Sequence, residues 1–391
     1  MNSKRLGIIF WFVGLNVFLP TLWAEDQPPK SILINQGHGQ YRFETFSKTQ
    51  TVDRIYKSMT GPKDTRQFFL LGKKSASNPP ELLWVTGFQS EVLDPQTNAN
   101  KSEEYICHNQ FKFNRKTFNR QARDVLFHNQ THQDLHLAIL GQGATKRTLP
   151  KGFGIPILST ESMGSLWMVL NNQKTSQPFQ VRLKSSFDFI RDKELSPDTP
   201  MKPLFHLRVA ILVPVPKGTP SASHCSTDED FEENAQPVLN ERNKIQMNGK
   251  HLEQSVHWLV PPGRHRYRYR LENLNIPFDT TVHYITSHLH GFGQYIELKD
   301  LTAQKIIFRS RAKNYQDRIG IASLEHYSSV QGIPVFKDHA YELTCEYNNP
   351  TSEPIDAMAS MYLYLWDKDF DRKAWRPKEA QGLSAVKSNN N

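Results

Sequence analysis

Hydrophobic and polar positions alternate over short distances along most of this chain. The clearest alternations lie at 67–71, 81–85 and 166–170, and Pro, Gly, Asn and Asp separate them at short intervals. A period of two residues turns successive side chains to opposite faces of a β-strand, whereas a helix needs a 3.6-residue period. No stretch of useful length shows the helical period, so the pattern predicts an all-β fold of the β-sandwich class.

A proline-rich joint at 196–200 divides the chain into two halves. We expect two jelly-roll β-sandwich domains, at 31–195 and 203–375, followed by a disordered polar tail at 376–391. The polar stretch 217–233 is expected to be a loop. The strands of the second half are predicted at 205–215, 255–260, 265–271, 280–287, 294–298, 305–309, 341–347 and 357–365.

Residues 1–24 have the organisation of a secretory leader. Lys4 and Arg5 precede an apolar run at 6–19, and Ala24 offers a cleavage point. The run is shorter than the roughly 20 apolar residues of a membrane-spanning helix, which favours cleavage over a retained anchor. We therefore expect a periplasmic or secreted protein that has no stable membrane span after the leader is removed.

The charge of the chain is moderate for its length. The formal net charge of +9 becomes +7 when Lys4 and Arg5 leave with the leader, and the other basic residues are interleaved with acidic ones. The densest basic stretch, 264–270, alternates basic and aromatic residues, as a half-exposed strand does. Nucleic acid is therefore not an expected partner.

The cysteines number three, namely Cys107, Cys225 and Cys345. An exported protein can form disulfides, and an odd count leaves at least one thiol without a partner in the same chain. None of the three forms a Cys-x-x-Cys pair, so the sequence does not indicate a zinc or redox motif of that kind.

The strongest chemical signal is the His-Leu-His segment at 288–290. On a strand, residues two apart share a face, so His288 and His290 can direct two imidazoles at one point. Paired neutral imidazoles suit copper, zinc, nickel or iron. A later strand carries Met358 and Met361, and a thioether ligand would favour copper among these metals. The spacing does not choose between the two methionines.

The region 259–365 resembles the catalytic domain of the ascorbate-dependent type II copper monooxygenases, the family of peptidylglycine hydroxylating monooxygenase and dopamine β-hydroxylase. The resemblance rests on four short motifs in family order, namely Pro261-Pro262-Gly263, Ile276-Pro277 before the His-Leu-His strand, the segment 344–348 and the Asp-x-Met segment 356–358. It implies that His288, His290 and Met358 bind the copper at which oxygen is activated. It also places Tyr362 on a family tyrosine beside that site, and it implies ascorbate or another reductant as electron source.

The N-terminal half resembles the same family more faintly, through 149–154 and through two positions of the family's electron-transfer copper site. Cys107-His108 replaces a His-His pair, and Asn171 or Asn172 replaces the third histidine. The resemblance therefore implies one copper ion and an eroded second site. Cys107, His108 and Asn172 are the candidates for a remaining second metal site, because a thiolate binds copper strongly. A buried or disulfide-bonded cysteine beside an ordinary histidine is the alternative.

Two departures from the family limit what the resemblance implies. Thr286 stands where the peptide-hydroxylating member has a substrate-binding arginine, so a C-terminal peptide is not an expected substrate. Ala359 stands where the family has the disulfide partner of the cysteine matching Cys345, which leaves Cys345 to pair with Cys225 or to remain free.

Three functions remain open at this point. The first is a copper monooxygenase-like oxidoreductase acting on a small molecule with O2. The second is a copper carrier or store that exchanges the metal with a donor or acceptor protein. The third is a jelly-roll module that binds carbohydrate or protein, in which the histidines are incidental.

The remaining histidines carry less information. His128, His132 and His136 have helical spacing, but their polar surroundings favour a loop or an outer strand. We expect His257, His283 and His339 to be structural residues.

Overall fold

The computed structural model describes residues 31–58, 60–71, 80–113, 136–196, 200–216, 244–247 and 250–372. The expectations for the leader, the tail at 376–391, the stretch 217–233, Cys225, His128 and His132 lie outside these residues. Within them the all-β prediction is confirmed, because the helical elements are two short 3-10 turns, η1 (Glu103–Tyr105) and η2 (Asp192–Glu194). No helix in the described ranges is long and apolar enough to cross a membrane.

The N-terminal half consists of two sheets that face each other. One sheet has the order β1-β2-β11-β5-β9, with β3 and β8 added to β11 and β5, and the other has the order β4-β10-β6-β7. Phe187 of β11 contacts the rings of Phe43, Phe68, Phe88 and Phe111, which come from both sheets, so aromatic packing holds the two layers together. The strands are β1 (Ile32–Gly37), β2 (Gln40–Phe46), β3 (Gln50–Val52), β4 (Lys63–Phe68), β5 (Leu82–Leu93), β6 (Ile106–Phe113), β7 (His136–Gly141), β8 (Lys146–Thr148), β9 (Phe153–Leu158), β10 (Met163–Val169) and β11 (Phe179–Arg191).

The C-terminal half repeats this layered arrangement. A sheet of order β12-β25-β18-β22 faces a sheet of order β17-β23-β19-β20-β21, and apolar side chains fill the space between them. Two smaller sheets, β13-β15-β14 and β16-β24, flank them. The strands are β12 (Lys202–Ala210), β13 (Val213–Pro216), β14 (Lys244–Met247), β15 (Lys250–Ser255), β16 (Trp258–Val260), β17 (Gly263–Leu271), β18 (Thr280–Leu289), β19 (Gly293–Asp300), β20 (Lys305–Asn314), β21 (Ile321–Leu324), β22 (Tyr327–Val335), β23 (Tyr341–Asn349), β24 (Ile355–Ala357) and β25 (Ala359–Trp366).

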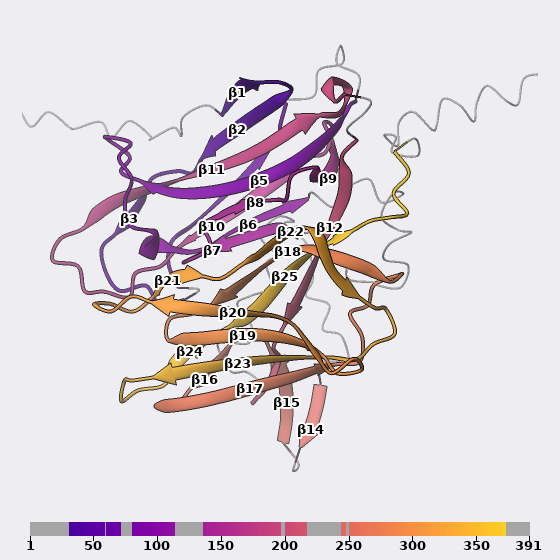
Figure 1. Ribbon diagram of the computed structural model, residues 1–391. Coiled ribbons are helices and arrows are strands. Elements are labelled where there is room, and N and C mark those ends of the chain that lie inside the picture. The colour runs from indigo at the N-terminus through magenta and orange to yellow at the C-terminus, as the bar shows by residue number, and fades with distance from the viewer. Residues whose placement is uncertain are drawn as a thin grey trace, which may run out of the picture.

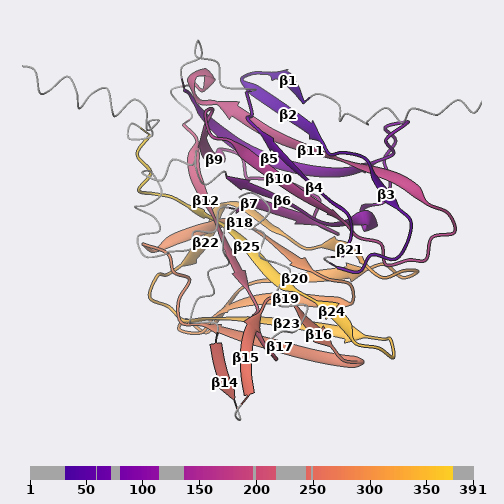
Figure 2. The same ribbon diagram turned by 180° about the vertical axis from the view of Figure 1, so that it is seen from behind.

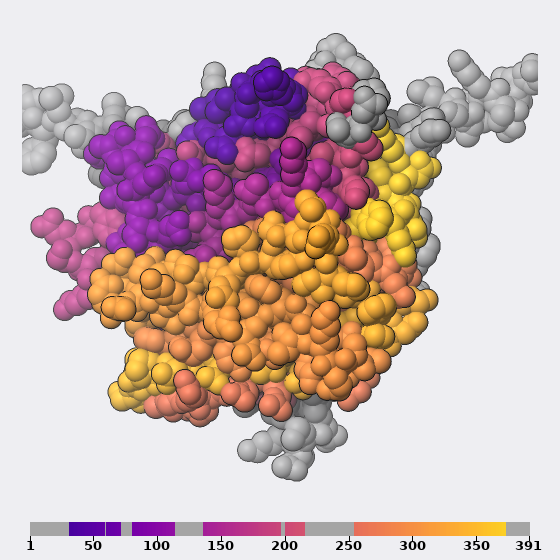
Figure 3. Space-filling model, viewed as in Figure 1, coloured from indigo at the N-terminus to yellow at the C-terminus, as the bar shows by residue number. Residues whose placement is uncertain are grey.

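The two halves share one sheet. Strand β12 leaves the joint and pairs in parallel with β9, with Lys202 opposite Phe153 and Pro203 opposite Gly154. Because β12 also pairs with β25, an eleven-stranded sheet runs from β1 to β22 through both halves (Figures 1 and 2). The space-filling view shows the surfaces of the two halves in contact along a broad front (Figure 3). The halves are thus joined by backbone hydrogen bonds as well as by the chain connection.

Side-chain packing between the halves centres on a buried guanidinium. Tyr284, Tyr362 and Tyr364 point from the shared sheet into the core of the N-terminal half. Arg147, which is 1% exposed, donates to the Tyr364 hydroxyl at 2.8 Å and to the Ile139 carbonyl, and its guanidinium lies 5.0 Å from the centre of the Tyr362 ring. A buried cation with these partners ties the two halves together.

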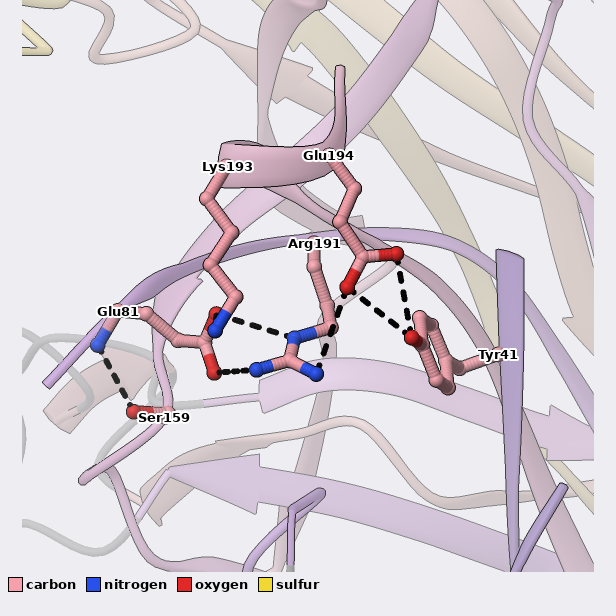
Figure 4. A network of polar contacts seen from close by, with 6 residues as sticks. All are labelled: Tyr41, Glu81, Ser159, Arg191, Lys193 and Glu194. Carbon is pink, nitrogen blue, oxygen red and sulfur yellow. Dashed lines mark hydrogen bonds and ion pairs between the residues drawn. The ribbon is translucent and has the colours of Figure 1, made fainter. Parts of the chain in front are cut away.

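An ion-pair network fixes the end of the first half just before the joint (Figure 4). Arg191, at the end of β11, binds the Glu81 carboxylate through Nε at 3.0 Å and lies 3.4 Å from Glu194. Glu194 in turn accepts from the Tyr41 hydroxyl at 3.0 Å. These contacts hold β2, β5 and β11 to the turn η2, from which the chain passes to β12.

The strand predictions agree with most of the structure. Three predicted strands are divided, namely 205–215 into β12 and β13, 255–260 between β15 and β16, and 357–365 at Met358. Strands β14, β21 and β22 and most of β15 were not predicted. β22 lies at the edge of its sheet and contains Gly332 and Pro334, which an edge strand tolerates and which obscure its pattern.

Candidate metal centre

The two histidines of the His-Leu-His segment lie together at the end of β18. Alternation turns His288 to the same face as Thr286 and Tyr284, which is the face toward the N-terminal half, while Leu289 enters the core of the C-terminal half. His290 follows directly after the strand. The ring centres of His288 and His290 are 5.2 Å apart and the rings are nearly perpendicular, at 87°. The predicted pair therefore forms one local cluster.

Met358 lies beside this cluster. It stands between β24 and β25, and β25 pairs with β18 so that Ser360 is opposite His288. The Tyr347 hydroxyl donates to the Met358 carbonyl at 2.6 Å and accepts from the His290 backbone N–H at 3.2 Å. One tyrosine thus joins the backbones of His290 and Met358. The Met358 side chain is buried and is not among the residues that line the adjacent cavity.

Asp356 organises the imidazoles. Its Oδ2 lies 2.8 Å from His290 Nδ1, in a contact that is not aligned as a hydrogen bond, and its Oδ1 lies 3.6 Å from His257 Nδ1. Burial alone would raise the pKa of Asp356, but His290 and His257 outweigh it and hold that pKa well below its usual range. Because Asp356 occupies the Nδ1 side of His290, the Nε2 atom is turned to the opposite side, where Ser58 Oγ lies 3.4 Å away.

His257 was expected to be structural, but the structure adds it to the cluster. Its ring centre lies 5.4 Å from that of His290. In the described part of the chain, His257, His290 and Asp356 place three ligand-type atoms within 4.8 Å of one another. The pairing of β16 with β24 produces this group, because it puts Trp258 opposite Ala357. Asp356 was visible in the Asp-x-Met motif, whereas nothing in the spacing of the sequence identified His257.

The N-terminal candidates lie at the same place. Strand β6 has a β-bulge against β10, where Met168 is opposite His108 and Val169 is opposite Ile106, so Cys107 is the extra residue. Bulges re-aim side chains, and here Cys107 lines the cavity that also receives His288 and His290.

This cavity has a volume of about 270 Å³ and lies between the two halves. The sequence predicted a copper site in one half and a separate eroded site in the other, but residues of both line one space. The lining residues are Lys57, Ser58, Cys107, Gln142, Leu170, Asn172, His288, Leu289, His290, Gly291, Phe292, Ile319, Thr351, Glu353, Pro354, Ile355 and Asp356.

Burial keeps two of the imidazoles neutral. Burial, followed by the neighbouring His290, His108 and His257, lowers the pKa of His288 far below its usual 6.5. Burial and the neighbours His257 and His290 lower the pKa of His108 to about 3. Neutral imidazole is the form that binds metal ions. The Nε2 atom of His108, which is 5% exposed, has no hydrogen-bond partner.

Tyr362 lies away from the cavity. Its ring stacks on His206 with centres 5.7 Å apart and lies under the Arg147 guanidinium, and it is opposite Thr286 in β18. The position implied by the resemblance is therefore occupied by a residue that packs between the halves and does not line the cavity.

The other candidates have structural positions. Cys345 is a free thiol buried in the C-terminal core, and burial raises its pKa. His283 bonds to Thr281 and to the Ser329 carbonyl, and His339 lies 2.7 Å from Asp300. His136 lies in an outer strand, one of the two positions expected for it: it opens β7, which is at the edge of its sheet, and contacts Gln110 at 3.1 Å.

Comparison with known proteins assigns this chain to no family. No protein-family model matches the sequence, and no curated protein matches it. Among solved structures, the Sputnik virophage structure is similar with a TM-score of 0.21 and 8% identity, over 94% of this chain and 91% of that one. The Cry4Aa toxin of Bacillus thuringiensis is similar with a TM-score of 0.17 and 7% identity, over 81% of this chain. The chain spans 59% of the toxin's length. Similarity at this level carries no argument about function.

Proposed function

We propose that this chain is an exported copper protein that binds one copper ion through His288, His290 and Met358 and uses it, with O2 and a reductant, to oxidise a small molecule. The observation that carries the proposal is the pair of imidazoles beside Met358 at the wall of a cavity, of which the His288 ring is buried and has a strongly lowered pKa. The donors fit the metal, because imidazole and thioether ligands together favour copper over harder cations. The resemblance of 259–365 to type II copper monooxygenases points the same way.

The residues around the donors have separable tasks. Asp356 fixes the orientation of His290 from the Nδ1 side, as carboxylates behind metal-binding histidines do. Tyr347 holds the two ligand segments at a constant separation through their backbones. When bound, copper supplies one-electron redox chemistry and a binding position for oxygen. The protein contributes donors held in place before the metal arrives.

The cavity suits a small and largely apolar substrate. Much of its wall is formed by Leu170, Leu289, Phe292, Ile319, Pro354 and Ile355. At about 270 Å³ it is close to the lower end of the roughly 300–1,000 Å³ typical of ligand pockets. Apolar walls exclude water from the ligands, which strengthens electrostatic interactions in the site. The leader-like residues 1–24 support export.

A second donor set favours a different metal. The group His257, His290 and Asp356 offers two imidazoles and a carboxylate. Such sets are typical of non-haem iron and also bind zinc. His290 belongs to both sets, so only the other histidine differs between them. His288 and His257 therefore distinguish the two sets.

The test is metal analysis of the chain without residues 1–24. The protein is loaded separately with Cu(I), Cu(II), Fe(II) and Zn(II), beside His288→Ala, His257→Ala and the control His265→Ala on the exposed strand β17. We expect close to one copper per chain in the wild type, the His257 variant and the control, and loss of copper in the His288 variant.

Other results would change the assignment. Iron or zinc that depends on His257, without copper that depends on His288, would contradict the proposal. One copper without oxygen uptake in the presence of ascorbate and candidate substrates would indicate a carrier. If the protein binds no metal, the function that remains is that of a module that binds carbohydrate or protein.

A further inference from the structure

We propose that Cys107 is a ligand of the same metal ion as His288 and His290, so that the centre is a copper–thiolate site to which both halves of the chain contribute. This inference rests on the copper centre proposed above. It replaces a separate second site around Cys107, His108 and Asn172 with a single composite one.

The thiol and both imidazoles lie around the same space. Cys107 Sγ is 3.8 Å from Ser58 Oγ, and that oxygen is 3.4 Å from His290 Nε2. The Ser58 hydroxyl thus lies near both the thiol and the Nε2 atom of His290. Because bonds from a metal ion to nitrogen and sulfur are only about 2.0–2.3 Å long, both side chains must move toward an ion that takes the place of this hydroxyl.

His288 approaches the same segment from the other side. Gly141 of β7 pairs with His108 of β6, and a methyl group at Gly141 would lie 2.9 Å from His288 Nδ1 and 3.2 Å from the Cys107 carbonyl oxygen. Only a glycine leaves room for the imidazole here. Strand β7, which pairs with the strand that contains Cys107, therefore leaves the space that the His288 ring occupies.

The β-bulge supplies an independent indication. It makes Cys107 the extra residue of β6, and Cys107 lines the cavity. The next residue, His108, is a buried imidazole whose Nε2 has no hydrogen-bond partner. A buried polar nitrogen without a hydrogen-bond partner destabilises the fold and calls for an explanation such as an ion nearby. Two adjacent donor-type residues thus lie on β6, and Cys107 is the one that lines the cavity.

Two imidazoles, a thiolate and a thioether form a donor set that is selective for copper. Binding of Cu(II) breaks the S–H bond of Cys107, forms the Cu–S bond and releases one proton to solvent, with no change of oxidation state. Such a thiolate–Cu(II) bond has an intense charge-transfer absorption in the visible range. Co(II) gives a corresponding thiolate absorption at shorter wavelength and does not oxidise thiols.

The experiment titrates the chain without residues 1–24 with Cu(II) and, separately, with Co(II), and records absorption and bound metal. The variants are Cys107→Ser and the matched control Cys345→Ser, which removes a buried thiol far along the chain in the C-terminal core. We expect one metal per chain and a thiolate band in the wild type and in Cys345→Ser. Cys107→Ser should keep the metal and lose the band.

A metal-bound wild type without a thiolate band, or a band that persists in Cys107→Ser, overturns this inference and leaves the copper centre standing. A wild type that binds no copper overturns both. If Cys107→Ser does not fold, alkylation of the wild-type protein tests whether Cys107 is a ligand. Bound Co(II) should protect Cys107 at least tenfold against iodoacetamide, as mass spectrometry measures it, and unchanged alkylation contradicts the proposal.

Discussion

Asp356 shows how one carboxylate determines what a histidine can do. It lies against the Nδ1 atom of His290, so that Nε2 is turned toward Ser58 and the cavity. We predict that Asp356→Asn weakens copper binding by about 10–100-fold, the usual effect of losing such a partner. Competition titration with a Cu(I) chelator measures this loss of copper affinity. Asp300→Asn is the matched control, because it disrupts a similar contact with His339 outside the site and should leave copper affinity unchanged.

His108 makes the stability of the metal-free protein depend on pH. The pKa of His108 is about 3 in the folded state, compared with an ordinary value of 6.5. Below pH 6.5 His108 is therefore protonated in the unfolded chain while it stays neutral in the folded chain. Stability is therefore fully present above pH 6.5 and falls as the pH decreases toward 3, by about 1.4 kcal/mol per pH unit for such a histidine.

Urea unfolding between pH 7 and pH 5 measures this slope. We predict a shallower slope in His108→Gln than in the wild type, whereas His265→Gln on the exposed strand β17 should keep the wild-type slope. Equal slopes in the wild type and His108→Gln would contradict the assignment.

Only part of the site could be predicted from single residues. His288 and His290 follow from the strand period, because residues two apart share a face. Asp356, His257 and Ser58 could not be found in this way. They meet at His290 through the β16–β24 pairing and through contact between the halves, neither of which leaves a local pattern in the sequence.

At the level of elements, the fit of β7 against β18 limits the space around the metal ligands. Gly141→Ala adds a methyl group 2.9 Å from His288 Nδ1, which forces the imidazole to move. We predict at least a tenfold loss of copper affinity, with a change in the free energy of unfolding of about 1–3 kcal/mol as for other overpacked sites. Gly154→Ala is the comparison, because its tightest contact is the flexible end of Met201. Its copper affinity should equal that of the wild type.

Strand alternation predicted most elements but not their ends or partners. The break at Met358 separates β24 from β25 and lets the Met358 carbonyl accept from Tyr347. An unbroken apolar pattern across 357–365 conceals it. The parallel pairing of β9 with β12 is equally hidden, since it depends on how the two sandwiches meet and not on either strand alone.

For the whole molecule, the shared sheet and the buried Arg147 predict cooperative unfolding. We expect tryptophan fluorescence and far-ultraviolet circular dichroism to report coincident unfolding transitions. Arg147→Met should lower the free energy of unfolding by about 1.5–3 kcal/mol, because it removes charge-assisted hydrogen bonds to Tyr364 and Ile139. Arg264→Met removes the contact of an exposed arginine with Glu346, which keeps its second partner Arg266, and should change the free energy of unfolding little. Two separate transitions in the wild type would show that the halves fold independently.

The position of the bound copper ion distinguishes the proposed site from its alternatives. Crystals of the copper-loaded chain, measured on both sides of the copper absorption edge, give the metal position from anomalous scattering. We predict one strong peak per chain in the cavity between the halves, at bonding distance from nitrogens of His288 and His290. A peak only at His257 and Asp356, or no peak in this cavity, would contradict it.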